Sequence, residues 1–259
     1  MLDQIVRTLE QLPHFNNCLW AGLMLFPRFL GFILVAPVLS RKEVPGLIKL
    51  GFAFLLTLIF VGFFKNTPPP AEYPMLVCII LNFIFGFIIG FIAQVIFDTI
   101  SAAGEMVNMQ MGMQSAVMFD PSAQAQISVM GRYFIFLGTV IFIKIGGVFW
   151  IILAFQRGFD IFPLYGTVIP LAQIVDMEYL IMLTGNILFI GLQIASPIII
   201  TTLCQDIILG TISKTAPQVN VFQLSFLFKP LIGCLIMIII LPLMVNTIVE
   251  YFEYYSMIY

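Results

Sequence analysis

The stretch Met75–Phe97 reads MLVCIILNFIFGFIIGFIAQVIF, and it decides the class of fold to which this chain belongs. It carries no charged side chain, and it reaches the length of about 20 residues that a helix needs to cross the hydrocarbon layer of a membrane. Within it, Gly86 and Gly90 lie four positions apart, a spacing that lets two helix backbones approach closely, and Ala93 extends the pattern. The stretch therefore predicts a membrane-spanning helix with a packing face.

The rest of the chain repeats this pattern. Of its 259 residues, 61% are hydrophobic and only 9% are charged, whereas soluble domains carry about 25% charged residues. Breakers such as Thr67–Pro70 separate the apolar segments and leave short connections, which is typical of antiparallel helix hairpins. We expect an all-α integral membrane protein, a single domain over residues 1–259 with several kinked helices that contact lipid. The six expected spans are Cys18–Leu39, Leu47–Phe64, Met75–Phe97, Tyr133–Phe155, Leu180–Leu209 and Phe222–Val249.

Several classes of function are disfavoured by composition. The net charge is −2 at pH 7, so the chain offers no basic field for nucleic acid. Its one histidine, His14, and its four widely spaced cysteines form no metal-ligand spacing, and the cysteines are expected to be small buried hydrophobes. Asp98 and Glu105 could be imagined as an acid/base pair, but no cluster of further catalytic side chains accompanies them. We therefore expect no enzyme, no cofactor and no metal.

The residues Gly104–Pro121 combine side chains that rarely occur together. They read GEMVNMQMGMQSAVMFDP, with methionines interleaved with amides and a carboxylate. Lipid-facing helices avoid such polar groups, because an unpaired one is costly in hydrocarbon. Thioether side chains are flexible and adapt to irregular gaps, so the segment predicts a movable seal in a conduit, with ordinary core packing as the alternative. The residues expected in this plug are Glu105, Met106, Met109, Gln110, Met111, Met113, Gln114, Met118 and Phe119.

Ionisable side chains within the apolar segments give a further signal. Each costs about 2.5–3.5 kcal/mol or more at a bilayer centre, so it needs a partner, a water-lined path or a neighbouring subunit. Pro27 beside Arg28, and Pro230 beside Lys229, indicate helices that break around a polar path. Snorkelling to the interface is an equal alternative for Lys49, Asp98 and Arg132, whereas interior pairing or subunit contact is favoured for Arg28, Lys144, Asp206 and Lys229.

Three separate motifs resemble the signatures of one known family. Phe26–Gly31 (FPRFLG), followed by Val44–Leu50 (VPGLIKL), is similar to the N-terminal pattern of the FliR/SctT family of type III export-gate proteins. The Ala103–Pro121 region resembles the central signature of that family, and Ala216–Phe222 (APQVNVF), followed by Lys229, resembles its C-terminal one. Their order, their spacing and the total length agree, so the resemblance covers nearly the whole chain and favours the flagellar branch.

This resemblance implies a function and a set of partners. Members of the family assemble with FliP-like and FliQ-like subunits into a helical export gate at the bacterial inner membrane, with an FlhB-like protein at the cytoplasmic side. The gate passes unfolded exported proteins, and the Met-rich segment would match the pore-plugging loop of the family. In such an assembly the interior charges would face protein. Contacts between helices or subunits are expected at Arg28, Lys49, Asp206, Lys214, Asn220 and Lys229.

Two alternatives to a flagellar gate subunit stay open. A virulence-type secretion gate subunit of the same family would share the fold and the mechanism. A secondary transporter would show two related halves with paired discontinuous helices, and the sequence contains no such repeat.

Overall fold

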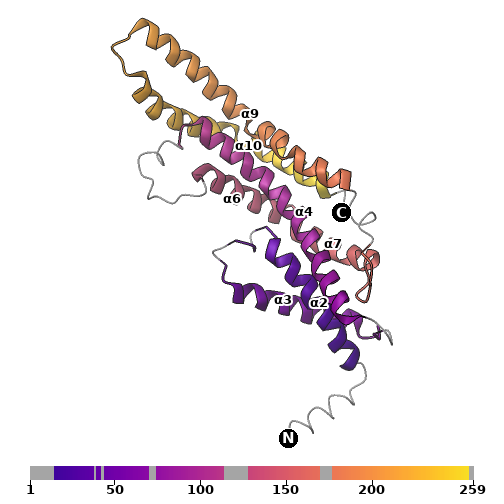
Figure 1. Cartoon of the computed structure of the whole chain (residues 1–259). Helices are drawn as coiled ribbons and strands as arrows, with labels where there is room; N and C mark the ends of the chain where they lie inside the picture. Colours follow the sequence, from indigo (N-terminus) through magenta and orange to yellow (C-terminus); the bar gives the residue numbers. More distant parts are fainter. Residues whose placement is uncertain are drawn as a thin grey trace. The chain divides into compact units, whose positions relative to one another are not determined.

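A computed structural model describes residues 15–37, 39–41, 44–69, 74–113, 128–169 and 177–256 of the chain. Within these ranges every regular element is a helix, which confirms the prediction of an all-α fold (Figure 1). Five helices are long and apolar enough to cross a membrane, or six if one bent pair counts as a single span. The elements are α2 (Phe15–Val35), α3 (Gly46–Val61), the short 3-10 helix η1 (Gly62–Phe64), α4 (Met75–Gln110), α6 (Val129–Lys144), α7 (Gly147–Ile161), α9 (Met177–Thr215) and α10 (Val221–Ser256).

The fourth expected span, Tyr133–Phe155, is not one helix. It is divided into α6 and α7, which are bent by 70° at the break between them. Gly146 lies in this break with a φ of +80°, a backbone conformation that only glycine adopts without steric cost. The apolar composition of the segment did not predict this break between α6 and α7, because the break depends on a single glycine.

The prolines act differently from the sequence-based prediction. Helix α2 runs through Pro27, and α10 runs through Pro230 and Pro242, so the expected breaks beside Arg28 and Lys229 are wrong. Around Pro27 the flanking residues are buried, and this packing holds the helix together although one backbone hydrogen bond is lost. Membrane helices tolerate proline when neighbouring groups form hydrogen bonds with the backbone atoms that the proline leaves unpaired.

The chain forms two compact units, and the first comprises residues 1–94 and 152–180. Helices α2 and α3 lie side by side in it (Figure 1). Helix α2 also packs closely on the first part of α4, where the glycine spacing predicted a packing face. A side chain at Gly86 would collide with the carbonyl of Arg28, and a Cβ at Gly90 would lie 2.8 Å from the carbonyl oxygen of Phe32. Only glycine permits this approach of the two backbones.

The second unit comprises residues 95–151 and 181–259. Helices α9 and α10 form a long hairpin in it (Figure 1). The hydroxyl of Tyr251 in α10 donates a hydrogen bond of 2.9 Å to the Thr99 hydroxyl in α4. The rings of Phe97, Phe142 and Phe252 pack on one another, with centroids 5.4–5.6 Å apart. These contacts join α4, α6 and α10 into one core.

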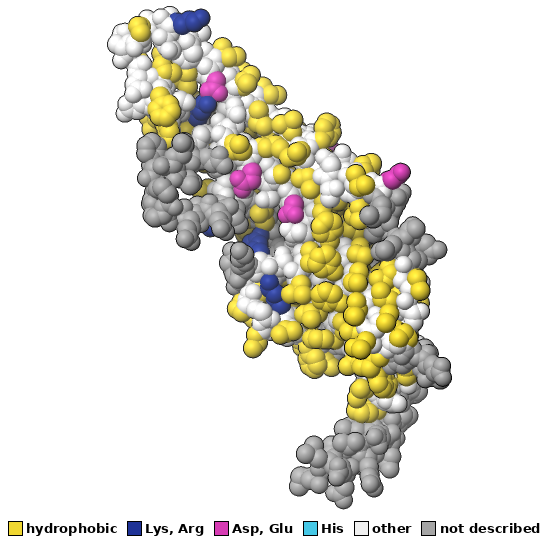
Figure 2. Space-filling model, in the orientation of Figure 1, with side chains coloured by type: hydrophobic (Ala, Val, Ile, Leu, Met, Phe, Trp, Pro, Cys, Tyr) yellow, Lys and Arg dark blue, Asp and Glu magenta, His cyan; other side chains and the backbone are white. Residues whose placement is uncertain are grey.

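The surface of the chain is largely apolar. On the face shown in Figure 2, hydrophobic side chains predominate and only scattered charged side chains interrupt them. Many large side chains are strongly exposed, among them Leu47 at 81% and Phe222 at 70%. A surface of this kind needs lipid or other protein to cover it.

Candidate functional site

A buried arginine lies at the centre of the first unit. Arg28 projects from α2 and is fully buried. Its Nε donates a hydrogen bond of 2.9 Å to Oδ1 of Asn82 in α4. Its Nη2 donates a bond of 2.7 Å to the carbonyl oxygen of Phe162, which directly follows α7. One guanidinium group therefore joins three parts of the unit that are distant in sequence.

Asn82 completes this network, and the sequence analysis did not select it. Its Nδ2 donates to the carbonyl oxygen of Cys78 in the preceding turn, at 2.8 Å, and to that of Leu164, at 2.9 Å. The side chain is fully buried. The signal in the sequence was a lone amide within an apolar run, because such a group in a membrane helix usually bonds across to another segment.

Aromatic rings compensate the charge of Arg28. Its Cζ lies 4.7 Å from the ring centroid of Phe85, 4.6 Å from that of Phe159 and 5.3 Å from that of Phe162. The faces of such rings attract cations, and the attraction grows when water is excluded. Within the described residues no carboxylate pairs with Arg28, so carbonyl dipoles and rings stabilise the guanidinium. We call these residues, Arg28, Asn82, Phe85, Phe159 and Phe162, the arginine cluster.

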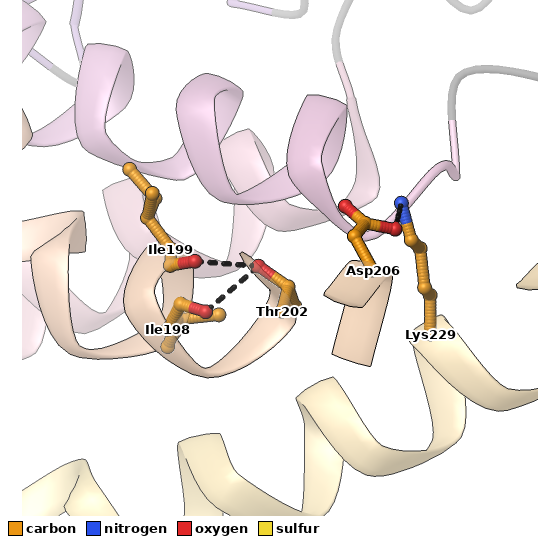
Figure 3. Close-up of polar contacts among 5 residues, drawn as sticks. All are labelled: Ile198, Ile199, Thr202, Asp206 and Lys229. Carbon is orange, nitrogen blue, oxygen red and sulfur yellow. Dashed lines mark hydrogen bonds and ion pairs between the residues drawn. The ribbon is translucent and has the colours of Figure 1, made fainter. Parts of the chain in front are cut away.

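An ion pair connects the two long helices of the second unit. Lys229 Nζ in α10 lies 2.6 Å from Asp206 Oδ1 in α9 (Figure 3). The Lys229 side chain is 19% exposed and that of Asp206 is 43% exposed, so the pair lies at the edge of the unit. One turn earlier in α9, the Thr202 hydroxyl is satisfied by the carbonyls of Ile198 and Ile199, each at 2.9 Å.

The described methionines of the expected plug differ in their surroundings. Helix α4 continues to Gln110, so the first part of the Met-rich segment is helical. Met109 is 60% exposed, whereas Met111 is fully buried, and a Cβ at Gly233 of α10 would meet its Cε at 2.7 Å. Met106, Gln110 and Met113 are half-buried. Gln114, Met118 and Phe119 lie outside the described residues.

Glu105 belongs to the last turns of α4, and its carboxylate lies beside the start of α6 in the same unit. Its Oε1 accepts a hydrogen bond of 3.4 Å from the backbone N–H of Ser128. Ser128 caps α6, because its Oγ accepts a bond of 2.8 Å from the N–H of Gly131. The N-terminus of a helix carries partial positive charge and favours a nearby carboxylate. Glu105 thus ties the last turns of α4 to the first turn of α6.

The other expected contact residues make local interactions. Lys49 Nζ donates to the carbonyl oxygen of Ser40 at 2.8 Å. Asn220 caps α10, with its Oδ1 accepting from the N–H of Gln223 at 3.3 Å. Lys214 and Lys144 are exposed in the last turns of α9 and α6, where a cation interacts favourably with the helix carbonyls. For the part of the chain that the structure describes, no group of three or more His, Cys, Asp or Glu could hold a metal ion.

Comparison with known proteins gives a consistent result. A family model described as bacterial export proteins, family 1, matches residues 19–255. The flagellar biosynthetic protein FliR of Escherichia coli strain K12 is 29% identical over 230 residues, which cover 86% of each chain. The FliR protein of Aquifex aeolicus strain VF5 is 28% identical over 233 residues, or 89% of each chain. The surface presentation of antigens protein SpaR of Shigella flexneri is 27% identical over 139 residues, which cover 53% of this chain and 52% of that protein.

Proposed function

The chain belongs to the bacterial export protein family 1, and from this membership we propose how its residues act in an export gate. It is a multi-pass protein of the bacterial inner membrane and a gate subunit of the flagellar type III secretion apparatus. The observation that carries this conclusion is the correspondence with flagellar relatives over most of both chains, whereas the virulence-associated relative corresponds over about half. The role of the chain in export is structural and channel-forming, without a catalytic step.

The partners in the proposed assembly are FliP-like and FliQ-like subunits, with an FlhB-like protein at the cytoplasmic side. The length of α10 supports the proposal that other subunits surround part of this helix. Its 36 residues would span about 54 Å if straight. Even at a tilt of about 40°, such a helix exceeds a hydrocarbon layer of about 30 Å by roughly 10 Å. Phe222 and Tyr254 near its two ends are 70% and 60% exposed, and neighbouring subunits would cover what lipid does not reach.

Within the gate we assign different tasks to the polar residues. The arginine cluster holds α2, α4 and the residues after α7 in one arrangement. The Asp206–Lys229 pair fixes the register of the α9–α10 hairpin, and its partial exposure leaves both groups within reach of a neighbouring subunit. Lys49, Lys214 and Asn220 stabilise helix ends and loops.

We assign the seal to Met109, the methionine at the end of α4 that is exposed. Met109 presents its side chain to the surroundings, whereas Met111 belongs to the core of the second unit. The amides of Gln110 and Gln114, which are close to these methionines in the sequence, would permit wetting once the gap opens, whereas an entirely apolar lining could stay dry.

The function is tested by genetic replacement and copurification. Deletion of the gene should abolish flagellar filament formation and secretion of filament protein into the medium, and the tagged chain should restore both. The tagged chain should also copurify with FliP-like and FliQ-like proteins of its own cell and be heterogeneous without them. A monodisperse, stable monomer in mild detergent, together with unchanged motility of the deletion strain, would contradict the proposal.

The seal is tested by a matched pair of substitutions in the assembled gate. Met109→Ala should leave copurification intact and raise ion conductance across the inner membrane. Met111→Ala leaves a cavity in a packed core, so it should destabilise the chain by roughly 2–5 kcal/mol and lower the yield of the assembly. Loss of assembly without leakage for Met109→Ala would mean that this methionine is structural.

A further inference from the structure

Helix α4 ends inside the second unit with a defined turn. The N–H of Gly112 donates to the carbonyl of Met109 at 3.0 Å, and the N–H of Met113 donates to that of Asn108 at 3.2 Å. Gly112 has a φ of +71°, the left-handed conformation that ends many helices. The turn thus pairs two of the last carbonyls of the helix. The two carbonyls that follow point along the helix axis, beyond the end of α4, and carry its partial negative charge.

Lys229 lies beyond this end of α4. Tyr251 of α10 bonds to Thr99 of α4. Further along α4, Met111 packs where a Cβ of Gly233 would lie, and Gly233 precedes Tyr251 in α10, so the two helices are antiparallel. Lys229 precedes Gly233 by four positions, which places both on one face of α10, about 6 Å apart along its axis. Lys229 therefore lies roughly one turn past Met111, at the level where a further turn of α4 would have placed N–H donors.

Gln205 of α9 reaches the same level. Helix α9 is antiparallel to α10 in the hairpin, so it runs in the direction of α4, and a Cβ at Gly191 would lie 3.4 Å from the backbone nitrogen of Ala103. From Gly191 to Gln205, α9 advances by roughly 21 Å. From Ala103 to Met111, α4 advances by only roughly 12 Å. Gln205 therefore also lies past the end of α4, directly beside Asp206 of the ion pair (Figure 3).

The amide of Gln205 is buried without a hydrogen bond. The residue is 8% exposed, and among the described residues neither Nε2 nor Oε1 has a partner. A buried polar group that lacks a partner destabilises the conformation in which it occurs, because water satisfies that group in the unfolded chain. In the last turns of α4, Oδ1 of Asn108 likewise has no partner within the described ranges, and Asn108 is 3% exposed. A donor in α9 and an acceptor in α4 are thus both unused in the same unit.

We propose that Gln205 is a positioning residue that binds the end of α4 in a second conformation of the second unit. In the present conformation, the Gly112 turn ends α4 below Lys229. A shift of the last turn of α4 toward α9 brings the carbonyls of that turn, or Oδ1 of Asn108, to Nε2 of Gln205. Met109, to which we assigned the seal, belongs to this turn and moves with it. The unpaired amide raises the free energy of the present conformation only, so it favours the shift. The inference rests on the proposed function only where it connects this shift with export.

The stability of the variant Gln205→Met tests the unpaired amide, because methionine has a similar length and no amide. The purified assembly is unfolded with sodium dodecyl sulfate, and the folded fraction of this chain is followed by its protease resistance. Gln205→Met should raise the ratio of folded to unfolded chain by at least about fivefold, since it removes a buried group without a partner. Gln193→Met, at an exposed position of α9, is the matched control and should leave the ratio unchanged. A lower ratio for Gln205→Met would show that the amide already has a partner in the present conformation, such as an ordered water, and would overturn the proposal.

Secretion of filament protein into the medium tests the second conformation. Gln205→Met should reduce secretion although copurification shows an unchanged amount of assembly, because the second conformation loses its contact with α4. Gln193→Met should secrete like the unchanged chain. Higher stability of Gln205→Met together with unchanged secretion would refute the second conformation. Continued secretion after deletion of the whole gene would instead contradict the proposed function, and the stability measurement alone would then decide whether the amide lacks a partner.

Discussion

The arginine cluster leads to a quantitative prediction about Arg28 and Asn82. In the variant Arg28→Met, Asn82 Oδ1 and the Phe162 carbonyl lose their donors. In the variant Asn82→Leu, the buried guanidinium keeps its charge and loses one acceptor. Losing a buried hydrogen bond to a charged group costs about 1.5–3 kcal/mol, so each single variant should lower the free energy of unfolding by about that amount.

The double variant distinguishes a coupled network from two independent contacts. Independent contacts would add to roughly 3–6 kcal/mol. The double variant contains no buried charge, and its two apolar side chains fill a similar volume. It should therefore cost no more than the larger single change, which corresponds to a coupling energy of about 1.5–3 kcal/mol. Neutral hydrogen bonds between membrane helices couple by only about 0.6 kcal/mol on average, so the expected value separates the two cases.

The assay is a titration of the purified assembly with sodium dodecyl sulfate in mixed micelles. The folded fraction of this chain is followed by its resistance to proteinase K on immunoblots. Arg41→Met is the matched control, because Arg41 is exposed and its removal should leave the midpoint unchanged. Single effects that add within about 0.5 kcal/mol would refute the reasoning, since they would show that Arg28 and Asn82 act separately.

Three further predictions concern the helix contacts. Reversal of the charge of either Asp206 or Lys229 should lower copurification, and exchange of both charges in one double variant should restore it, with a contribution of about 1 kcal/mol or less because the pair is partly exposed. Failure of the exchange to restore copurification would show that another group pairs with one of these residues. Glu105→Gln should weaken its interaction with the α6 N-terminus by roughly 0.3–1 kcal/mol, with a lower SDS midpoint at unchanged helix content as the measurement and an unchanged midpoint as the contrary result. Gly86→Ala should sharply reduce the amount of chain in the membrane on immunoblots, because the added methyl group collides with the Arg28 carbonyl. Gly51→Ala is the control, because nothing lies within 4 Å of a Cβ at that position, and equal amounts of both variants would contradict the close helix contact.

The sequence predicted the helices of this fold well, because long apolar runs and proline breakers are local signals. It failed at the α6–α7 break, where one glycine with positive φ decides the direction of the chain. It also overestimated Pro27 and Pro230, because continuity of a helix through proline depends on the packing around it. These two errors have the same origin, since the environment of a residue is a tertiary property.

The candidate site was predictable only in part. An arginine in an apolar run indicates a need for partners, and the sequence identified Arg28 on that ground. Its partners lie 54 and 134 positions away, and one of them is a backbone carbonyl, which no side-chain pattern can reveal. Likewise, the Met-rich pattern did not distinguish exposed Met109 from buried Met111, because that difference depends on the packing of Met111 against Gly233 of α10.

The separation of 134 residues between Arg28 and Phe162 also constrains the biosynthesis of the chain. At about 5–20 residues per second, the ribosome needs roughly 7–27 s to add the carbonyl partner after it has added the arginine. During that interval the nascent α2 carries a cation whose final acceptor does not yet exist. We therefore expect α2 to remain near the membrane surface and to insert only after α7 has left the ribosome. Nascent chains stalled before Phe162 should leave Cys18 open to a water-soluble thiol reagent, and protection at that stage would show that α2 is inserted before its partner arrives.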